Sequence, residues 1–186
     1  MRLATVEFGS LLSYSPRGTS ETAIKSKDIM RLLKTDGFVQ DPPILMSELV
    51  AQTVKKNLMD LPFASFFRSK PILVPTPNSA LARPDTLWVP DRLPKALVRR
   101  GLGQNVMQCL VRVKALPKAA TSDAANRPKA AAHYDSMKVQ KVLSEPEEIL
   151  LVDDIVTRGA TLLGAANKLA MHSRRLTSLR TRLCGQ

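Results

Sequence analysis

The most constraining feature of the sequence is an apolar run that ends in two adjacent acids and is followed by a short loop and an apolar helical pattern. Residues 149–152 are Ile, Leu, Leu and Val, and Asp153 and Asp154 follow directly. A short apolar run between polar segments predicts a buried strand of a parallel sheet. Beyond the loop, apolar residues recur at helical spacing, at Leu162, Leu163, Ala166 and Leu169. This order predicts an α/β fold with an open, mostly parallel sheet flanked by helices.

The loop between this strand and this helix has the composition of an anion site. Amides at a helix N-terminus point outward with a favourable dipole, and Gly159 lets a ligand approach the backbone closely. Two hydroxyls and a guanidinium add side-chain donors. The two carboxylates, in turn, are costly near a core unless something pairs with them. The pattern indicates a ligand with vicinal hydroxyls at one end and a phosphate at the other, such as a ribose 5-phosphate unit.

The segment 149–161 resembles the signature of type I phosphoribosyltransferases, enzymes that use phosphoribosyl pyrophosphate (PRPP). Arg158 stands where that signature has a second threonine. The resemblance implies that Asp153 and Asp154 bind the ribose hydroxyls and, through ribose or water, Mg²⁺. It also implies a cradle for the 5-phosphate, made of Thr157, Arg158, Gly159, Ala160 and Thr161. The alternative is that the two acids only end a strand and the loop only starts a helix.

A weaker resemblance, to the ComF-like branch of that superfamily, extends over about residues 70–170. The run Leu-Val-Pro-Thr-Pro at 73–77 is similar to the strand and loop that contact pyrophosphate, which implies that backbone amides of Thr76, Asn78 and Ser79 hold the leaving group. Residues 99–104 resemble another run of this branch, although a solvated helix face explains these arginines equally well. The zinc-binding segment of many relatives is absent, because the N-terminal part contains no cysteine.

Residues 114–133 are dominated by alanine, lysine and proline, which predicts a mobile basic loop. We expect this loop to close over bound PRPP, with Arg127, Lys129 and His133 as catalytic residues that stabilise the departing pyrophosphate. A disordered linker and an ordinary surface histidine are the alternatives.

The remaining elements are predicted from periodicity and turn residues. We expect helices at 20–34 and at 47–61, the latter capped by Ser47. A further helical region is expected at 93–113, interrupted at Gly101 and Gly103, with Val106, Leu110 and Val113 facing inward in its second part. Strands are expected at 71–75 and 134–139. The segment 173–186 is either a thin edge strand or a basic tail. At 186 residues, we expect an N-terminal extension with irregular structure and a helix at 1–45 and a phosphoribosyltransferase-like domain at 46–186.

The composition bears on partners. A formal charge of +12 makes the surface attractive to polyanions, which leaves nucleic acid, an acidic protein partner and a phosphorylated substrate open. Only 4% of the residues are aromatic, so a stacking platform for single-stranded nucleic acid is poorly supplied. The two cysteines lie far apart and predict free thiols. No segment is apolar enough to cross a membrane or act as a leader, so we expect a cytoplasmic protein.

Three functions compete on these grounds. The first is a phosphoribosyltransferase that transfers ribose 5-phosphate from PRPP to an unidentified nitrogen acceptor, with Mg²⁺ and release of pyrophosphate. The second is a non-catalytic or effector subunit of the same fold, which binds nucleic acid or a protein partner, as an oligomer or within a larger complex such as a regulator or a phage-defence or toxin system. The third is a nucleic-acid protein that never binds PRPP.

Overall fold

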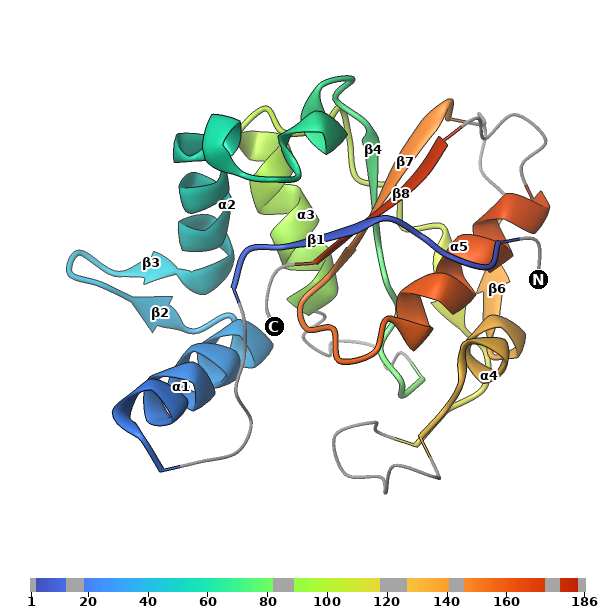
Figure 1. The fold of residues 1–186 in the computed structure, drawn as a ribbon, viewed down its shortest axis with the longest axis horizontal. Helices are drawn as coiled ribbons and strands as arrows, with labels where there is room; N and C mark the ends of the chain where they lie inside the picture. The colour runs from blue at the N-terminus through green and yellow to red at the C-terminus, as the bar shows by residue number, and fades with distance from the viewer. Residues whose placement is uncertain are drawn as a thin grey trace.

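A computed structural model describes residues 3–12, 19–81, 89–117, 127–140, 146–172 and 178–183, the last of these by its backbone only. Its centre is a four-stranded sheet in which all neighbouring strands are parallel (Figure 1). The strand order is β1 (Phe8–Ser10), β8 (Ser178–Leu183), β7 (Glu148–Asp153) and β4 (Ile72–Pro75). The chain is therefore of mixed α/β class, as the sequence predicts.

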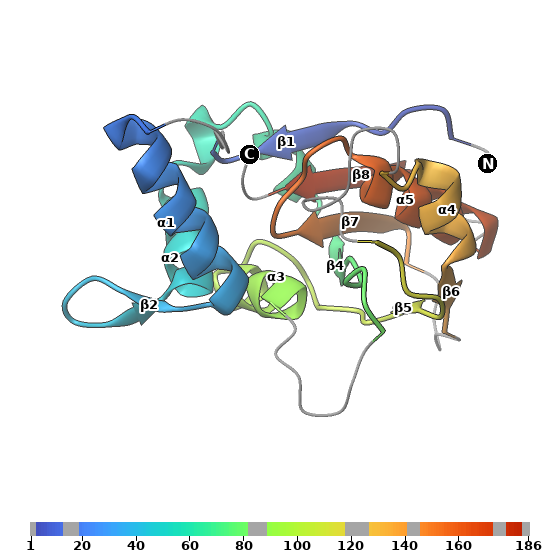
Figure 2. The ribbon, with the colours of Figure 1, turned by 90° about the horizontal axis from the view of Figure 1, so that it is seen from below.

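Helices cover both faces of the sheet. Figures 1 and 2 both show α1 (Glu21–Thr35), α2 (Met46–Lys56) and α3 (Val89–Arg99) on one side of the strands, and α4 (Ala130–Asp135) and α5 (Ala160–His172) on the other. Strand β7 is buried on both faces because its successive side chains enter two different cores. Leu150 and Val152 pack with α2 and α3, whereas Ile149 and Leu151 pack with α5.

The expected helix at 93–113 is wrong beyond Arg99. Helix α3 ends there, and Gly101 takes a φ of 74°, which ends the helical turn. The chain then runs extended beside β4: the amide of Leu73 donates to Asn105 O at 2.9 Å, and the amide of Met107 donates to Leu73 O at 2.9 Å. A Cβ at Gly103 would lie 2.8 Å from Leu73 Cγ, so the close approach requires glycine. Val113 is exposed rather than inward-facing.

The segment after this extension forms a separate two-stranded ribbon. Strand β5 (Leu110–Arg112) pairs antiparallel with β6 (Met137–Val139). The predicted loop at 114–133 therefore ends in α4, and the predicted strand at 134–139 begins only at Met137. Residues 118–126 of that loop lie outside the described residues.

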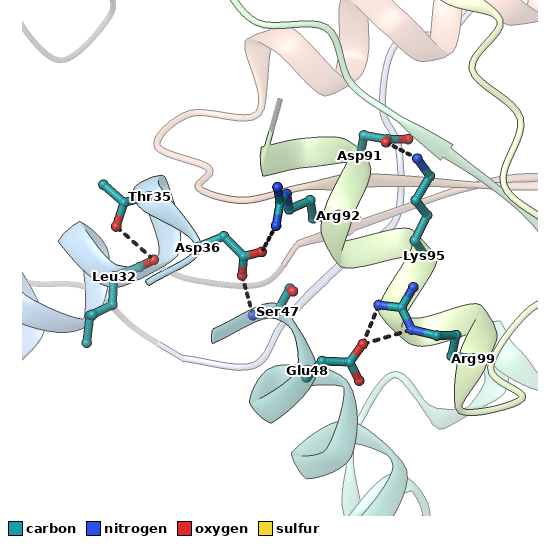
Figure 3. A network of polar contacts seen from close by, with 9 residues as sticks. All are labelled: Leu32, Thr35, Asp36, Ser47, Glu48, Asp91, Arg92, Lys95 and Arg99. Atoms are coloured by element: carbon teal, nitrogen blue, oxygen red, sulfur yellow. Dashed lines mark hydrogen bonds and ion pairs between the residues drawn. The ribbon is translucent and has the colours of Figure 1, made fainter. Parts of the chain in front are cut away.

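The first helices form a unit around a buried acid. Ser20 caps α1, and Asp36 ends it with a φ of 48°. Asp36 Oδ1 accepts from the amide of Ser47 at 2.8 Å, and its Oδ2 lies 3.3 Å from Arg92 Nη1 (Figure 3). Helix α2 begins at Met46, so Ser47 is inside the helix and is not its cap. Between α1 and α2 the chain forms the antiparallel pair β2 (Phe38–Val39) and β3 (Ile44–Leu45). The 3-10 turns Leu58–Asp60 and Ala64–Phe67 follow α2.

The segment 178–183 is a strand, but it is not at an edge. Strand β8 lies between β1 and β7, so residues of the N-terminal region form the edge of the sheet. The division of the chain at residue 45 stays a prediction. In the described part of the chain, no helix is both long enough and apolar enough to span a membrane.

Candidate functional site

The carboxyl ends of β4 and β7 open into one cavity of about 480 Å³. The two strands are neighbours in register, with Pro75 opposite Val152, so the loops that follow them start side by side. Ligands of open parallel sheets bind at this edge. The walls come from the end of β7 and the start of α5 with the loop between them, from the loop after β4, from β5 and α4 with residues that lie between those two elements, and from one residue each of α1 and α3. The residues are Lys34, Pro77, Asn78, Ser79, Ala80, Pro90, Arg112, Pro117, Arg127, Pro128, His133, Asp153, Asp154, Ile155, Val156, Thr157, Arg158, Gly159, Ala160 and Thr161.

The two acids lie together at the end of β7. The amide of Asp154 donates to Asp153 Oδ1 at 3.0 Å, and the amide of Ile155 donates to Asp154 Oδ1 at 2.9 Å. Asp153 is buried, and this burial, reinforced by the charge of Asp154, raises the pKa of its carboxyl well above the usual range. A hydrogen bond from the side chain of Thr76 acts in the opposite direction. A ligand with hydroxyl donors would satisfy these crowded carboxyls.

The predicted phosphate loop lines the same cavity with all five of its residues. Gly159 adopts a φ of 68°, and its carbonyl accepts from the amide of Leu163 at 2.9 Å, which forms the first turn of α5. A Cβ added at Gly159 would meet no atom within 4 Å, so this glycine is required for its backbone conformation and not for space. The amides before this turn have no helical carbonyl to bind, which makes them available to an anion.

The loop after β4 contains the three residues that are predicted to hold pyrophosphate through their amides. Asn78 and Ser79 line the cavity, but the amide of Thr76 donates to Val152 O at 2.9 Å and is not free for a ligand. Thr76 contributes through its side chain instead, by its hydrogen bond to Asp153.

Arg112, which sequence reasoning missed, supports this loop. Its Nε donates to Asn78 O at 2.8 Å, its Nη2 donates to Pro77 O at 3.1 Å, and its Nη1 donates to Ser136 Oγ. Burial lowers the pKa of the guanidinium to about 10, against the effect of nearby Asp153, so it stays charged at neutral pH. One pattern in the sequence could have indicated that Arg112 is buried. Side chains of a strand alternate between its two faces, so Arg112 lies on the same face of β5 as the buried Leu110, and Val111 lies on the other.

Of the three expected catalytic residues, Arg127 and His133 line the cavity and Lys129 does not. Lys129 precedes α4 as its N-cap residue. His133 is buried, and its Nδ1 has no hydrogen-bond partner among the described residues. Burial together with the charge of Arg112 lowers its pKa to about 4. Its imidazole is therefore neutral at pH 7 and adds no positive charge to the cavity.

Helix α4 is held in place by close packing on α5. A Cβ at Gly164 would lie 2.7 Å from His133 Cβ and 2.8 Å from Ala130 O. Lys168 Nζ lies 3.7 Å from the centre of the Tyr134 ring, a cation–π contact between the two helices. This packing fixes His133 beside the cavity.

Lys34, near the end of α1, also lines the cavity and was not identified from the sequence. No local pattern connects Lys34 with Asp153 and Asp154, which lie more than a hundred positions later in the chain. Among the described residues, no group of three or more His, Cys, Asp or Glu side chains is arranged to hold a metal ion. Two carboxylates without further acidic ligands suit Mg²⁺ that is bound mainly by substrate oxygens and water.

No family model matches the chain, and no curated protein matches it either.

Proposed function

We propose that this chain is a phosphoribosyltransferase of type I fold that binds PRPP with Mg²⁺ and transfers its ribose 5-phosphate unit to a nitrogen acceptor. The observation that carries the proposal is that Asp153 and Asp154 share one cavity with the glycine turn at the start of α5. Carboxylates for hydroxyls and amides for a phosphate are what a ribose 5-phosphate unit requires.

The arrangement of the strands gives further support. In chain order, β4, α3 and the extended segment at 104–107 form one strand–helix–strand succession, and β7, α5 and β8 form another, both with parallel neighbours. That succession is expected of the type I phosphoribosyltransferase fold, with the β5–β6 ribbon and α4 beside the carboxyl edge. The cavity lies at this edge, where open α/β sheets bind nucleotides.

In the proposed reaction, the bond between ribose C1 and pyrophosphate breaks while a bond from the acceptor nitrogen to C1 forms. Asp153 and Asp154 would accept hydrogen bonds from the ribose hydroxyls and orient the sugar. Amides of residues 157–161 would hold the 5-phosphate, and amides of Asn78 and Ser79 would bind the leaving pyrophosphate beside Arg127. Mg²⁺, when bound with PRPP, would offset the charge that develops on the pyrophosphate.

Calorimetry with PRPP and Mg²⁺ tests the proposal. We expect the variant with Asp153→Asn and Asp154→Asn to bind PRPP about a hundredfold more weakly, since hydrogen bonds to charged groups contribute about 1.5–3 kcal/mol each. The variant with Asp28→Asn and Asp60→Asn, which removes the same charge from exposed positions, should bind like the parent. Equal PRPP affinity of the two double variants, or no binding by the parent, contradicts the proposal.

The formal charge of +12 favours a second candidate, a subunit that binds PRPP without turnover and uses its basic surface for nucleic acid or an acidic protein partner. Assays of pyrophosphate release with a panel of nitrogen acceptors separate the two functions. PRPP binding without release, together with nucleic-acid binding that weakens steeply with salt, would favour this candidate.

A further inference from the structure

The loop at 76–79 carries no glycine, and the described residues 76–81 contain no helix, so its backbone needs an external support to present amides to an anion. Arg112 supplies contacts of this kind. All three of its guanidinium nitrogens donate to protein acceptors, two of which are the consecutive carbonyls of Pro77 and Asn78. A planar guanidinium presents its donors in a rigid fork, which fixes the direction of two such acceptors, whereas the donors of an ammonium group rotate.

These two bonds determine where the amides point. Among the described peptide bonds the cis bond is Asp41–Pro42, so the bonds after Pro77 and Asn78 are trans. In a trans peptide the N–H points opposite to the C=O. With both carbonyls turned toward Arg112, the amides of Asn78 and Ser79 point away from the guanidinium, and neither donates to a protein acceptor among the described residues. Adjacent backbone amides that bind no protein acceptor are groups that an anion can accept hydrogen bonds from.

We propose that Arg112 is a positioning residue that aligns the Asn78 and Ser79 amides for the pyrophosphate end of the ligand. This inference rests on the proposed function for the identity of the ligand. It does not depend on the 5-phosphate loop at 157–161, which connects β7 to α5. Among the described residues, this loop has no hydrogen bond to Arg112.

The support of Arg112 itself extends to α4. Ser136, the C-cap of that helix, accepts from Arg112 Nη1, while its hydroxyl donates to His133 O at 2.8 Å. The amide of Val113 donates to Ser136 O at 2.8 Å, which joins the same residue to the end of β5. Ser136 therefore offers a way to weaken the position of Arg112 without removing its charge.

The test uses calorimetry with two probes, inorganic pyrophosphate with Mg²⁺ and ribose 5-phosphate. We expect Arg112→Lys, which keeps the charge but loses the planar fork, to bind pyrophosphate about tenfold more weakly and ribose 5-phosphate within about twofold of the parent. Ser136→Ala should weaken pyrophosphate binding about threefold in the same selective way. Arg99→Lys, at a surface ion pair with Glu48 outside the cavity, is the matched control and should change neither affinity.

Parent-like pyrophosphate affinity in Arg112→Lys would show that its charge alone matters and would overturn the inference. So would an equal loss of both probes in a folded Arg112→Lys. If Arg112→Lys does not fold, Ser136→Ala decides, and a parent-like or unselective result there overturns the inference. A parent that binds pyrophosphate selectively through Arg112 but fails to bind PRPP would contradict the proposed function and leave this assignment intact.

Discussion

The loop that follows β7 and the loop that follows β4 begin at neighbouring positions of the sheet, but they are held in different ways. The first carries its own means of support: Gly159 supplies the turn, α5 supplies the free amides, and the two acids precede them. The second is held from outside, by Arg112 and, through Ser136, by α4. The loop after β7 is therefore shaped by residues that are close in sequence, whereas the loop after β4 depends on residues that are distant in sequence.

The largest effect on stability is expected at Gly164 of α5, where α4 packs, because α4 supports the loop after β4 through Ser136. In Gly164→Ala, the new Cβ would clash with His133 Cβ and the backbone of α4, which should cost about 2–3 kcal/mol of unfolding free energy. Pyrophosphate affinity should fall more than ribose 5-phosphate affinity. Urea denaturation and calorimetry measure the two effects.

The matched control is Gly37→Ala, whose Cβ would meet mainly the flexible end of Leu32 and should cost less. Equal weakening of both ligands in Gly164→Ala would mean that the two loops do not differ in their dependence on α4.

The second-largest effect concerns the pH dependence of stability and involves His133, which lies in α4. The pKa of His133 is lowered from about 6.5 unfolded to about 4 folded, so between these values the unfolded state binds the proton more readily. The stability that neutral His133 contributes is complete above about pH 6.5 and is lost as the pH falls toward 4, by about 2 kcal/mol. Denaturation from pH 7 to 4.5 should show this loss in the parent and much less of it in His133→Phe.

His172→Phe is the control, because His172 is exposed at the end of α5. A parent-like pH dependence in His133→Phe would contradict the assignment of a buried, neutral imidazole.

A pair of glycine variants tests the self-supporting loop. Gly159 and Gly101 have φ values of 68° and 74°, and neither would give an added Cβ a contact within 4 Å. Alanine at either position should therefore cost about 1 kcal/mol of stability. Only Gly159→Ala should also weaken ribose 5-phosphate binding, by about tenfold, as calorimetry can show. Equal affinity of the two variants would indicate that the turn at Gly159 is not part of the phosphate site.

The smallest effect is expected at Asp153, which contacts both loops. Its folded pKa is raised, so the unfolded state loses its proton first, and stability falls as the pH rises above about 4. Asp153→Asn should therefore raise the unfolding free energy of the ligand-free protein at pH 7 by about 1 kcal/mol, with little effect near pH 4. Thermal melting measures this, with Asp60→Asn, at an exposed position, as control.

The same contrast explains what the sequence could predict. Strand β7, its acids and the turn into α5 were predictable because strand burial, turn and helix start depend on consecutive residues. The second part of the helical region expected at 93–113 was wrong because Val106, Leu110 and Val113 have helical spacing, while the backbone of Leu73 offers hydrogen bonds to an extended chain. Arg112 and Lys34 could not be assigned, since only the tertiary fold brings them to the cavity.

The position of β8 between β1 and β7 has a consequence for assembly. Phe8 pairs with Thr181, so β1 must wait until β8 has been synthesised before it has this neighbour in the sheet. Until then β7 has one open side, and the closure of so long a loop is entropically expensive. Completion of the sheet should be a late, slow event, and an interrupted chain would expose an unprotected strand edge of the kind that promotes aggregation.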